Sequence, residues 1–155
     1  MSIIKIADLG ISSGVGTPAF YAYKSSGQTI SNNTNTKVTF ETELFDSDGK
    51  YDASSSRFTP NVVGKYLVTG VVSMTNHASG AYCQIRPRKN GSEIFNELRV
   101  NQGSGDSDTS VKSTFMVELD ADDYLEIFVR HNGGSTEDTR TGHEVRFMAQ
   151  RIIGA

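Results

Sequence analysis

Short segments in which apolar and polar residues alternate recur along this chain, and residues that favour turns separate them. The clearest segment spans residues 81–89, where Cys83 and Ile85 share one face. Alternation with a period of two is the pattern of a β-strand with one buried and one solvated face. Asn90-Gly91 follows directly, and this dipeptide is a strong signal for a tight hairpin. The segment 92–100 is therefore the predicted partner strand.

Other segments predict more strands of the same kind. Residues 36–44 alternate, with Val38, Phe40 and Leu44 on the face expected to be buried. Residues 64–75 form the longest apolar stretch, and their β-branched content favours a central strand covered on both faces. Further strands are expected at 19–23, 111–119, 125–130 and 144–153. About eight to ten strands without a convincing helix predict an all-β fold, an antiparallel jelly-roll sandwich.

Composition agrees with many strands joined by many turns. Gly, Ser, Thr and Asn make up about a third of the 155 residues, and this mixture disfavours helices. Fifteen Lys and Arg against 18 Asp and Glu leave a formal net charge of -3, which argues against a phosphate-driven nucleic-acid binder. The single cysteine excludes an intrachain disulfide framework.

The chain divides into a short lead-in segment and one domain. Residues 1–17 show neither strand nor helix periodicity, so we expect an N-terminal arm that needs a partner surface to become ordered. Residues 18–155 are the predicted jelly-roll domain. The first ten residues are too short and too broken by charge for a secretory signal. No window approaches the roughly 18 continuous apolar residues of a membrane span, so membrane insertion is not expected.

Six residues between positions 40 and 66 stand at a specific spacing. They are Phe40, Asp46, Tyr51, Phe58, Gly64 and Tyr66. This spacing resembles the signature of the C1q domain, in the C1q/tumour-necrosis-factor-like (C1q/TNF-like) superfamily of jelly rolls, and segments 123–127 and 144–149 resemble its last strands. The four aromatic residues would pack the sandwich, while the glycine would supply a turn or a close backbone approach. The motif identifies a fold and says little about a ligand.

The resemblance implies a homotrimer built around a threefold axis. Four apolar residues lie opposite the inward faces of their predicted strands: Leu67, Val71, Phe128 and Met148. In a monomer such a surface would be a liability, whereas a trimer would bury it, so these residues are the possible trimer contact. The alternative is that a single subunit covers both faces of its own sheets.

A second resemblance concerns the location of the protein. Residues 5–14 look like lead-in segments of structural proteins from tailed bacteriophages. We therefore expect a non-enzymatic trimer on the virion surface that decorates the capsid as a knob or cement protein, with residues 1–17 contacting the capsid or another virion protein. The starting Met1 favours a complete chain, and a small decoration protein fits that reading. If 1–155 is a fragment, the receptor-binding tip of a tail fibre fits equally well.

A further alternative is a free C1q-like lectin or adhesin that acts outside a virion, secreted or extracellular. In each case three polar loops, 76–80, 102–109 and 132–142, are the surface expected to meet a host, and a host surface glycan is a candidate ligand. A basic strip of Arg86, Arg88 and Lys89 could also serve a glycan or an acidic partner, although a solvated sheet face explains it equally well.

No residue pattern in the chain indicates catalysis or a cofactor. Cys83 alternates with Ile85 on an apolar face, which favours a buried structural thiol over a nucleophile. The three histidines lie far apart without zinc-ligand spacing, so no metal site is predicted from them. The carboxylates of Asp46, Asp48 and Asp52 could hold calcium through oxygen ligands, but turn chemistry explains Asp48-Gly49 sufficiently.

Overall fold

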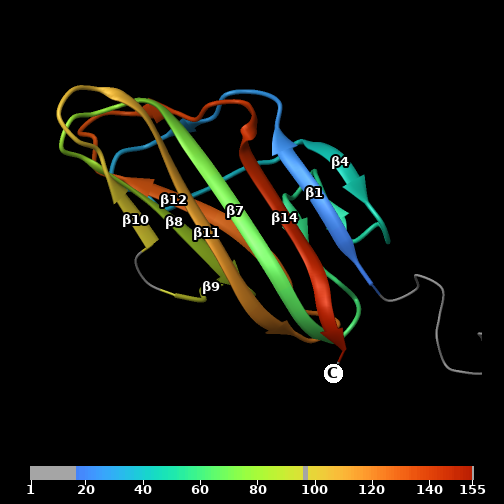
Figure 1. Ribbon diagram of the computed structural model, residues 1–155. Coiled ribbons are helices and arrows are strands. Elements are labelled where there is room, and N and C mark those ends of the chain that lie inside the picture. The colour runs from blue at the N-terminus through green and yellow to red at the C-terminus, as the bar shows by residue number, and fades with distance from the viewer. Residues whose placement is uncertain (1–16, 96–97, 155) are drawn as a thin grey trace, which may run out of the picture.

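Two antiparallel sheets face each other in the structure, a computed structural model that describes residues 17–95 and 98–154 (Figure 1). Within these ranges the chain forms strands and loops without a helix, and so has no helix that could cross a membrane. This architecture confirms the predicted all-β jelly-roll sandwich. Apart from Thr17, the predicted arm 1–17 lies outside the described residues.

The first sheet has five strands in the order β11-β7-β14-β1-β4. Their bounds are β11 (Ser107–Leu119), β7 (Gly64–His77), β14 (Gly142–Gly154), β1 (Ala19–Lys24) and β4 (Thr42–Asp46). All neighbours are antiparallel. The apolar segment 64–75 lies inside β7, which pairs on both sides as a central strand, as predicted.

The second sheet follows the order β10-β8-β12-β6-β5. Its strands are β10 (Leu98–Asn101), β8 (Tyr82–Lys89), β12 (Leu125–His131), β6 (Arg57–Phe58) and β5 (Tyr51–Asp52), with β3 (Thr36–Lys37) beside β12 and β9 (Ser92–Glu93) beside β8. A separate small pair joins β2 (Thr29–Ile30) to β13 (Glu137–Asp138). Asn90 and Gly91 both have positive φ and form the predicted hairpin turn between β8 and β9.

The four aromatic residues of the spaced motif lie buried between the sheets. The ring of Phe20 stacks on Tyr51 at 4.6 Å and on Phe58 at 4.7 Å, which links the first sheet to the second. Gly64 meets the last strand so closely that an added Cβ would lie 2.7 Å from the backbone oxygen of Ile153. A close backbone approach is therefore what this position requires.

The predicted continuous strand over 36–44 is wrong. Residues 36–37 pair with β12 in one sheet and residues 42–46 pair with β1 in the other, so the chain between them crosses the sandwich. Val38 and Phe40 are buried in this crossing, but Leu44 is 60% exposed. A register shift in the β1–β4 pairing accompanies this difference from a regular alternation.

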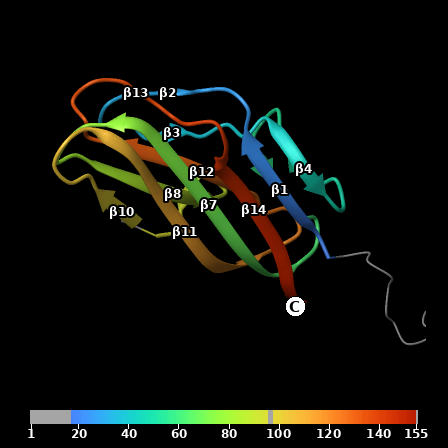
Figure 2. The same cartoon turned by 45° about the horizontal axis from the view of Figure 1, so that its top comes forward.

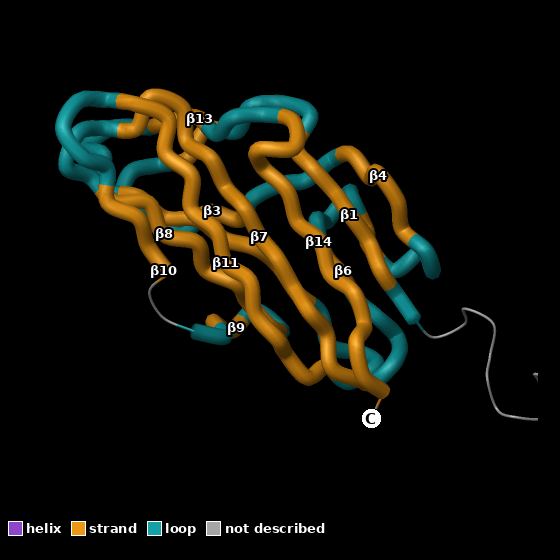
Figure 3. The backbone as a smooth tube through the Cα atoms, viewed as in Figure 1, coloured by secondary structure: helices purple, strands orange, loops and turns teal. Residues whose placement is uncertain are grey.

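The two ends of the sandwich differ in what they carry. Ala19 pairs with Gln150 and Gly64 pairs with Gly154, which places the start of β1 and the end of β14 at one end. The loops around 76–81, 102–106 and 132–136 gather at the opposite end (Figures 2 and 3). The chain therefore enters and leaves the described domain far from these loops.

Candidate functional site

The outward face of the five-stranded sheet carries a cluster of apolar side chains, which we call the apolar face: Tyr21, Phe45, Leu67, Met116 and Met148. The register places them side by side, because Tyr21 pairs with both Met148 and Phe45, and Leu67 pairs with Met116. Met116 is 68% exposed and Phe45 is 49% exposed. A shallow groove lies between Phe45, Leu67 and Met148. Such a concentration of exposed apolar groups indicates an interaction surface.

The structure brings together three of the four residues expected at a trimer contact. Leu67 and Met148 belong to the apolar face, and Val71 lies on the same side of β7, buried beside Lys112 and Arg146. Phe128 does not join them, because it lies in β12 of the other sheet, where the Arg88 guanidinium covers its ring at 3.8 Å. Phe128 therefore shares no sheet face with the other three residues of the possible trimer contact.

Toward the loop end the same sheet face becomes polar. Thr69 and Thr114 share a hydrogen bond of 3.0 Å across β7 and β11, and Ser73 and Ser110 share one of 2.6 Å. Further along, the Arg140 guanidinium pairs with the carboxylates of Asp108 and Glu144. The apolar face is thus confined to the half of the sheet nearer the chain termini.

Carboxylates of the same subunit offset most of the charge of the basic strip on the other sheet. Arg86 donates to Glu93 at 2.7 Å, and the Arg88 guanidinium lies 3.7 Å from the same carboxylate. Lys89 pairs with Asp123 at 2.6 Å. Two carboxylates thus face three cations, which reduces the positive charge open to an acidic ligand.

At the loop end, backbone N–H groups of loop 76–80 tie it to the other two predicted loops. Gly80 donates to Gly103 and Ser79 to Asp106, and Ala78 donates to Glu137 at 3.3 Å. An open hollow between the loops is lined by these residues: Thr75, Asn76, Ala78, Asp106, Gly133, Ser135, Thr136, Glu137 and Asp138. Its lining contains three carboxylates and neither lysine nor arginine, so it favours a positively charged ligand.

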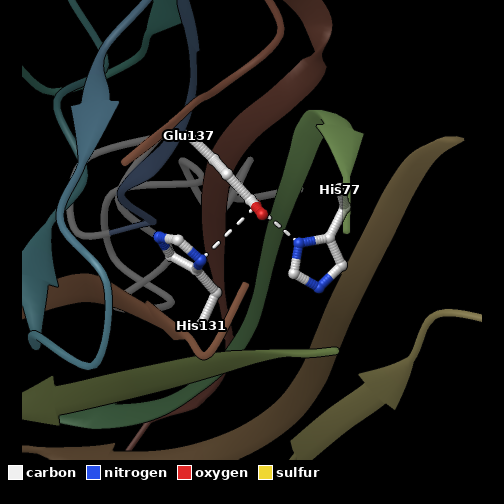
Figure 4. A group of neighbouring side chains, drawn as sticks. All are labelled: His77, His131 and Glu137. Atoms are coloured by element: carbon white, nitrogen blue, oxygen red, sulfur yellow. Dashed lines mark hydrogen bonds and ion pairs between the residues drawn. The ribbon is translucent and has the colours of Figure 1, made fainter. Parts of the chain in front are cut away.

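Two histidines and a glutamate meet behind this hollow (Figure 4). Nδ1 of His77 lies 2.5 Å from Oε2 of Glu137, and Nδ1 of His131 lies 3.4 Å from the same oxygen. Both histidines are fully buried, and the Glu137 side chain is 7% exposed. In the ranges that the structure covers, this is the one group of three ligand atoms within 4.8 Å of one another. The sequence did not predict it, since His77 lies more than fifty residues from His131 and Glu137 in the chain.

The carboxylates of Asp46, Asp48 and Asp52, considered above for calcium, are not among the described groups whose ligand atoms lie within 4.8 Å of one another. The backbone N–H of Tyr51 donates to Asp46 at 2.7 Å. Hydrogen bonds from Ser54 and Ser55 hold the Asp52 carboxylate and lower its pKa to about 2. These contacts are turn chemistry.

The only cysteine is confirmed as a buried residue. Cys83 has no exposed surface and lies in the core beside Ile85. Burial raises the pKa of its thiol to about 12, and the nearby Glu137 carboxylate adds to the effect. Because the thiolate is the reactive form, this cysteine is unsuited to nucleophilic catalysis.

Comparison with known proteins identifies the family. The C1q domain model matches residues 19–147, which is most of the chain. The protein belongs to the C1q family. A search of curated protein sequences finds no match to it.

Solved structures share the fold of this C1q domain at low sequence identity. The globular domain of zebrafish complement 1qA is 18% identical, with 89% of this chain and 99% of that chain covered and a TM-score of 0.59. The Eiger TNF of S. frugiperda is 14% identical over 90% of this chain and 93% of its own, with a TM-score of 0.61. Murine APRIL is 13% identical over 88% and 99%, with a TM-score of 0.64.

Membership of the C1q family bears on assembly and on catalysis. C1q/TNF-like domains commonly form trimers and are generally not enzymes. The spaced residues that carried the resemblance are a structural signature, because the aromatic four are buried and Gly64 meets the last strand. The motif of this C1q domain therefore specifies the fold and does not identify a ligand.

Proposed function

We propose that this C1q domain forms a homotrimer through the apolar face and acts by binding, not by catalysis. The observation that carries the proposal is the exposure of Phe45, Met116 and their neighbours on one sheet of an isolated subunit. Removing this apolar surface from water would favour association, at about 25 cal/mol for each Å² buried. A closed threefold arrangement can bury one such patch on every subunit.

We also propose that the trimer sits on a virion surface and decorates a bacteriophage capsid. The support is the resemblance of residues 5–14 to lead-in segments of tailed-phage structural proteins. The described chain starts at Thr17, at the end opposite the three loops. Residues 1–17 would bind the capsid or another virion protein, and the loop end would point away from it. A receptor-binding fibre tip, or a free lectin or adhesin, would use the same loop end to bind a host glycan.

The trimer is tested by measuring mass in solution with multi-angle light scattering. We expect three times the 16.9 kDa of one chain. The double variant Phe45→Lys/Met116→Lys should give a folded monomer, because both side chains are exposed in the subunit and only association would bury the new charges. Leu98→Lys is the matched control, an apolar residue 40% exposed on the other sheet. A monomeric wild-type protein, or a trimeric double variant, would refute the proposed interface.

The virion role is tested separately by cosedimentation with empty capsids of a tailed phage. Binding that is lost on deletion of residues 1–17 supports decoration of the capsid. Binding to host cells or to a glycan array, without affinity for capsids, would reject decoration in favour of host recognition. Neither outcome depends on the result of the mass measurement.

A further inference from the structure

We propose that His77, His131 and Glu137 form a binding site for a transition-metal ion, and that Zn²⁺ suits it best. Each residue comes from a different part of the fold. His77 is the last residue of β7, His131 is the last residue of β12, and Glu137 begins β13. Their ligand atoms lie within 4.8 Å of one another at the back of the hollow between the loops. The site is independent of the proposed trimer.

The ligand set determines the class of ion. Two imidazole nitrogens with one carboxylate oxygen are a set that zinc uses when a fourth position stays open to water or another ligand. Calcium and magnesium prefer oxygen ligands alone and are poorly matched to two histidines. Imidazole also suits Co²⁺, Ni²⁺ and Cu²⁺, so Co²⁺ can serve as a spectroscopic substitute.

The ring of His131 is oriented as a metal ligand would be. Its Nε2 lies 3.0 Å from the Ile30 carbonyl oxygen, and the carbonyl can only accept, so Nε2 carries a hydrogen. In the neutral ring Nδ1 is then the nitrogen with the free electron pair, and it faces the Glu137 carboxylate. Metal-binding histidines are commonly held in this way, through a bond from the other ring nitrogen to a carbonyl oxygen.

Hydrogen bonds alone do not explain every close contact between the side chains of this cluster. Oε2 of Glu137 and Nδ1 of His131 are both acceptors, and their separation of 3.4 Å calls for a proton or a cation between them. Gly133 donates to that nitrogen from its backbone at 3.2 Å, so a metal ion would compete with this bond. Nε2 of His77 has no hydrogen-bond partner, so no contact at that nitrogen fixes the tautomer of the ring. Its Nδ1 can therefore carry either a proton or a metal ion.

Holding zinc would require shifts of up to about 1.5 Å between ligand atoms, because these atoms lie no more than 4.8 Å apart. With Zn–N distances of about 2.0 to 2.1 Å, ligand atoms in a tetrahedral site lie about 3.3 Å apart. The separation of His131 Nδ1 from Glu137 Oε2 already has this value, at 3.4 Å. His77 Nδ1 lies 2.5 Å from the same oxygen, as expected where a proton joins them, and a metal ion would replace that proton.

The surrounding chain leaves room for the carboxylate and a route for the ion. A Cβ added at Gly133 would lie 1.8 Å from Oε1 of Glu137, so the absence of a side chain lets the loop close over the glutamate. Glu137 itself lines the open hollow, together with Asp106 and Asp138. These carboxylates would raise the local concentration of cations at the mouth of the site.

The proposal is tested with the full chain, freed of metal by a chelator and then titrated with Zn²⁺ in a calorimeter. We expect one ion per subunit and a rise in melting temperature that the chelator reverses. Co²⁺ should give the visible absorption of a four-coordinate site. Glu137→Gln, which keeps the side-chain shape, should weaken binding at least tenfold. Asp120→Asn is the control, because it removes an exposed carboxylate at the other end of the domain and should leave binding unchanged.

A measurement on the wild-type chain covers the case in which a variant fails to fold. Zn²⁺ should shift the imidazole nitrogen resonances of two histidines, and the third, His143 on β14, should stay where it is. Absence of saturable Zn²⁺ or Co²⁺ binding to the folded protein would overturn the proposal. So would binding that Glu137→Gln leaves intact, or a shift confined to His143.

Discussion

The buried lysine of β1 offers a sharp test of how the crossing segment is held. The Lys24 side chain is 1% exposed, and its Nζ donates to the Thr39 hydroxyl at 2.7 Å and to Glu41 Oε1 at 2.8 Å. The bonds join β1 to the segment that passes from one sheet to the other. Lys24→Met removes the charge, keeps most of the side-chain volume, and leaves Glu41 without its cation.

The loss of stability expected for Lys24→Met can be worked out from the pKa of the Glu41 carboxyl group. Burial alone would raise its pKa, but hydrogen bonds, with that from Lys24 foremost, outweigh burial and lower the pKa from 4.5 to about 2. At 1.36 kcal/mol for each pKa unit this difference corresponds to about 3 kcal/mol. The Glu41 side chain is 34% exposed, so solvent screening reduces the contribution to about 1 to 2 kcal/mol. Lys24→Met should cost about 2 to 3 kcal/mol, because the half-buried Thr39 and the Glu41 carboxylate also lose their donor.

The direction of the pH dependence is fixed by the lowered pKa. A carboxyl group whose pKa is lower in the folded state stabilises the protein above its unfolded value of 4.5. That contribution is lost as the pH falls toward about 2, where the folded carboxylate takes up its proton. Wild-type stability should therefore decline over this window, and Glu41→Gln should flatten the decline. Glu43→Gln on β4 is the exposed control and should leave the window unchanged.

The assay is urea unfolding of Lys24→Met, Glu41→Gln and the double variant. One fixed protein concentration is used, because the stability of the proposed trimer would depend on concentration. We expect a coupling free energy of about 1 to 2 kcal/mol at pH 7. At pH 2 the coupling should be at most half as large. A coupling below about 0.5 kcal/mol at pH 7, or one that is equal at both pH values, would refute the role given to this ion pair.

Two further predictions concern the motif and the turn that follows β4. Gly64→Ala should lower stability by about 1 to 3 kcal/mol in thermal unfolding. The added Cβ would lie 2.6 Å from Arg151 Nε and 2.7 Å from the Ile153 backbone oxygen. An unchanged melting temperature would contradict that close approach. Millimolar calcium should leave the melting temperature unchanged, because Ser54 and Ser55 already donate hydrogen bonds to the Asp52 carboxylate. A rise in melting temperature that Asp52→Ala abolishes would show a calcium site in this turn.

The sequence predicts the β-sandwich, but it does not predict that the chain passes from one sheet to the other between residues 37 and 42. Alternation identifies which side chains are buried, and Val38 and Phe40 are buried as expected. It does not identify the neighbouring strand, because pairing depends on residues far away in the chain. Residues 36–37 and 42–46 therefore looked like one strand, although β12 pairs with the first and β1 with the second.

The same difference, between which residues are buried and which strands are neighbours, explains why the four residues of the possible trimer contact do not all share one face. Alternation placed Leu67 and Phe128 on outward faces, and both are outward in the structure, but on opposite sheets. Met116 and Tyr21 were missed, although Tyr21 alternates with buried neighbours and Met116 with partly buried ones. An outward apolar residue indicates an interaction surface only where other apolar residues lie beside it. The sheet order β11-β7-β14-β1-β4 creates that neighbourhood.

The cluster proposed to bind a metal ion has no zinc-ligand spacing in the sequence. His77 and His131 end two strands that lie in different sheets, and Glu137 follows in a loop-end pair. Zinc motifs can be recognised in a sequence when two ligands stand a few residues apart on one element. Here only the packing of the two sheets brings the ligands together.

Strand β7 connects the two proposed sites and also keeps them apart. Its outward residue Leu67 belongs to the apolar face, and its last residue, His77, belongs to the cluster. Ten residues of extended strand separate them by about 33 Å. At that distance the effects of substitutions are expected to add independently, so the two proposals can fail or succeed separately. The arrangement places association near the chain termini and leaves the loop end, with its acidic hollow, free to meet a ligand.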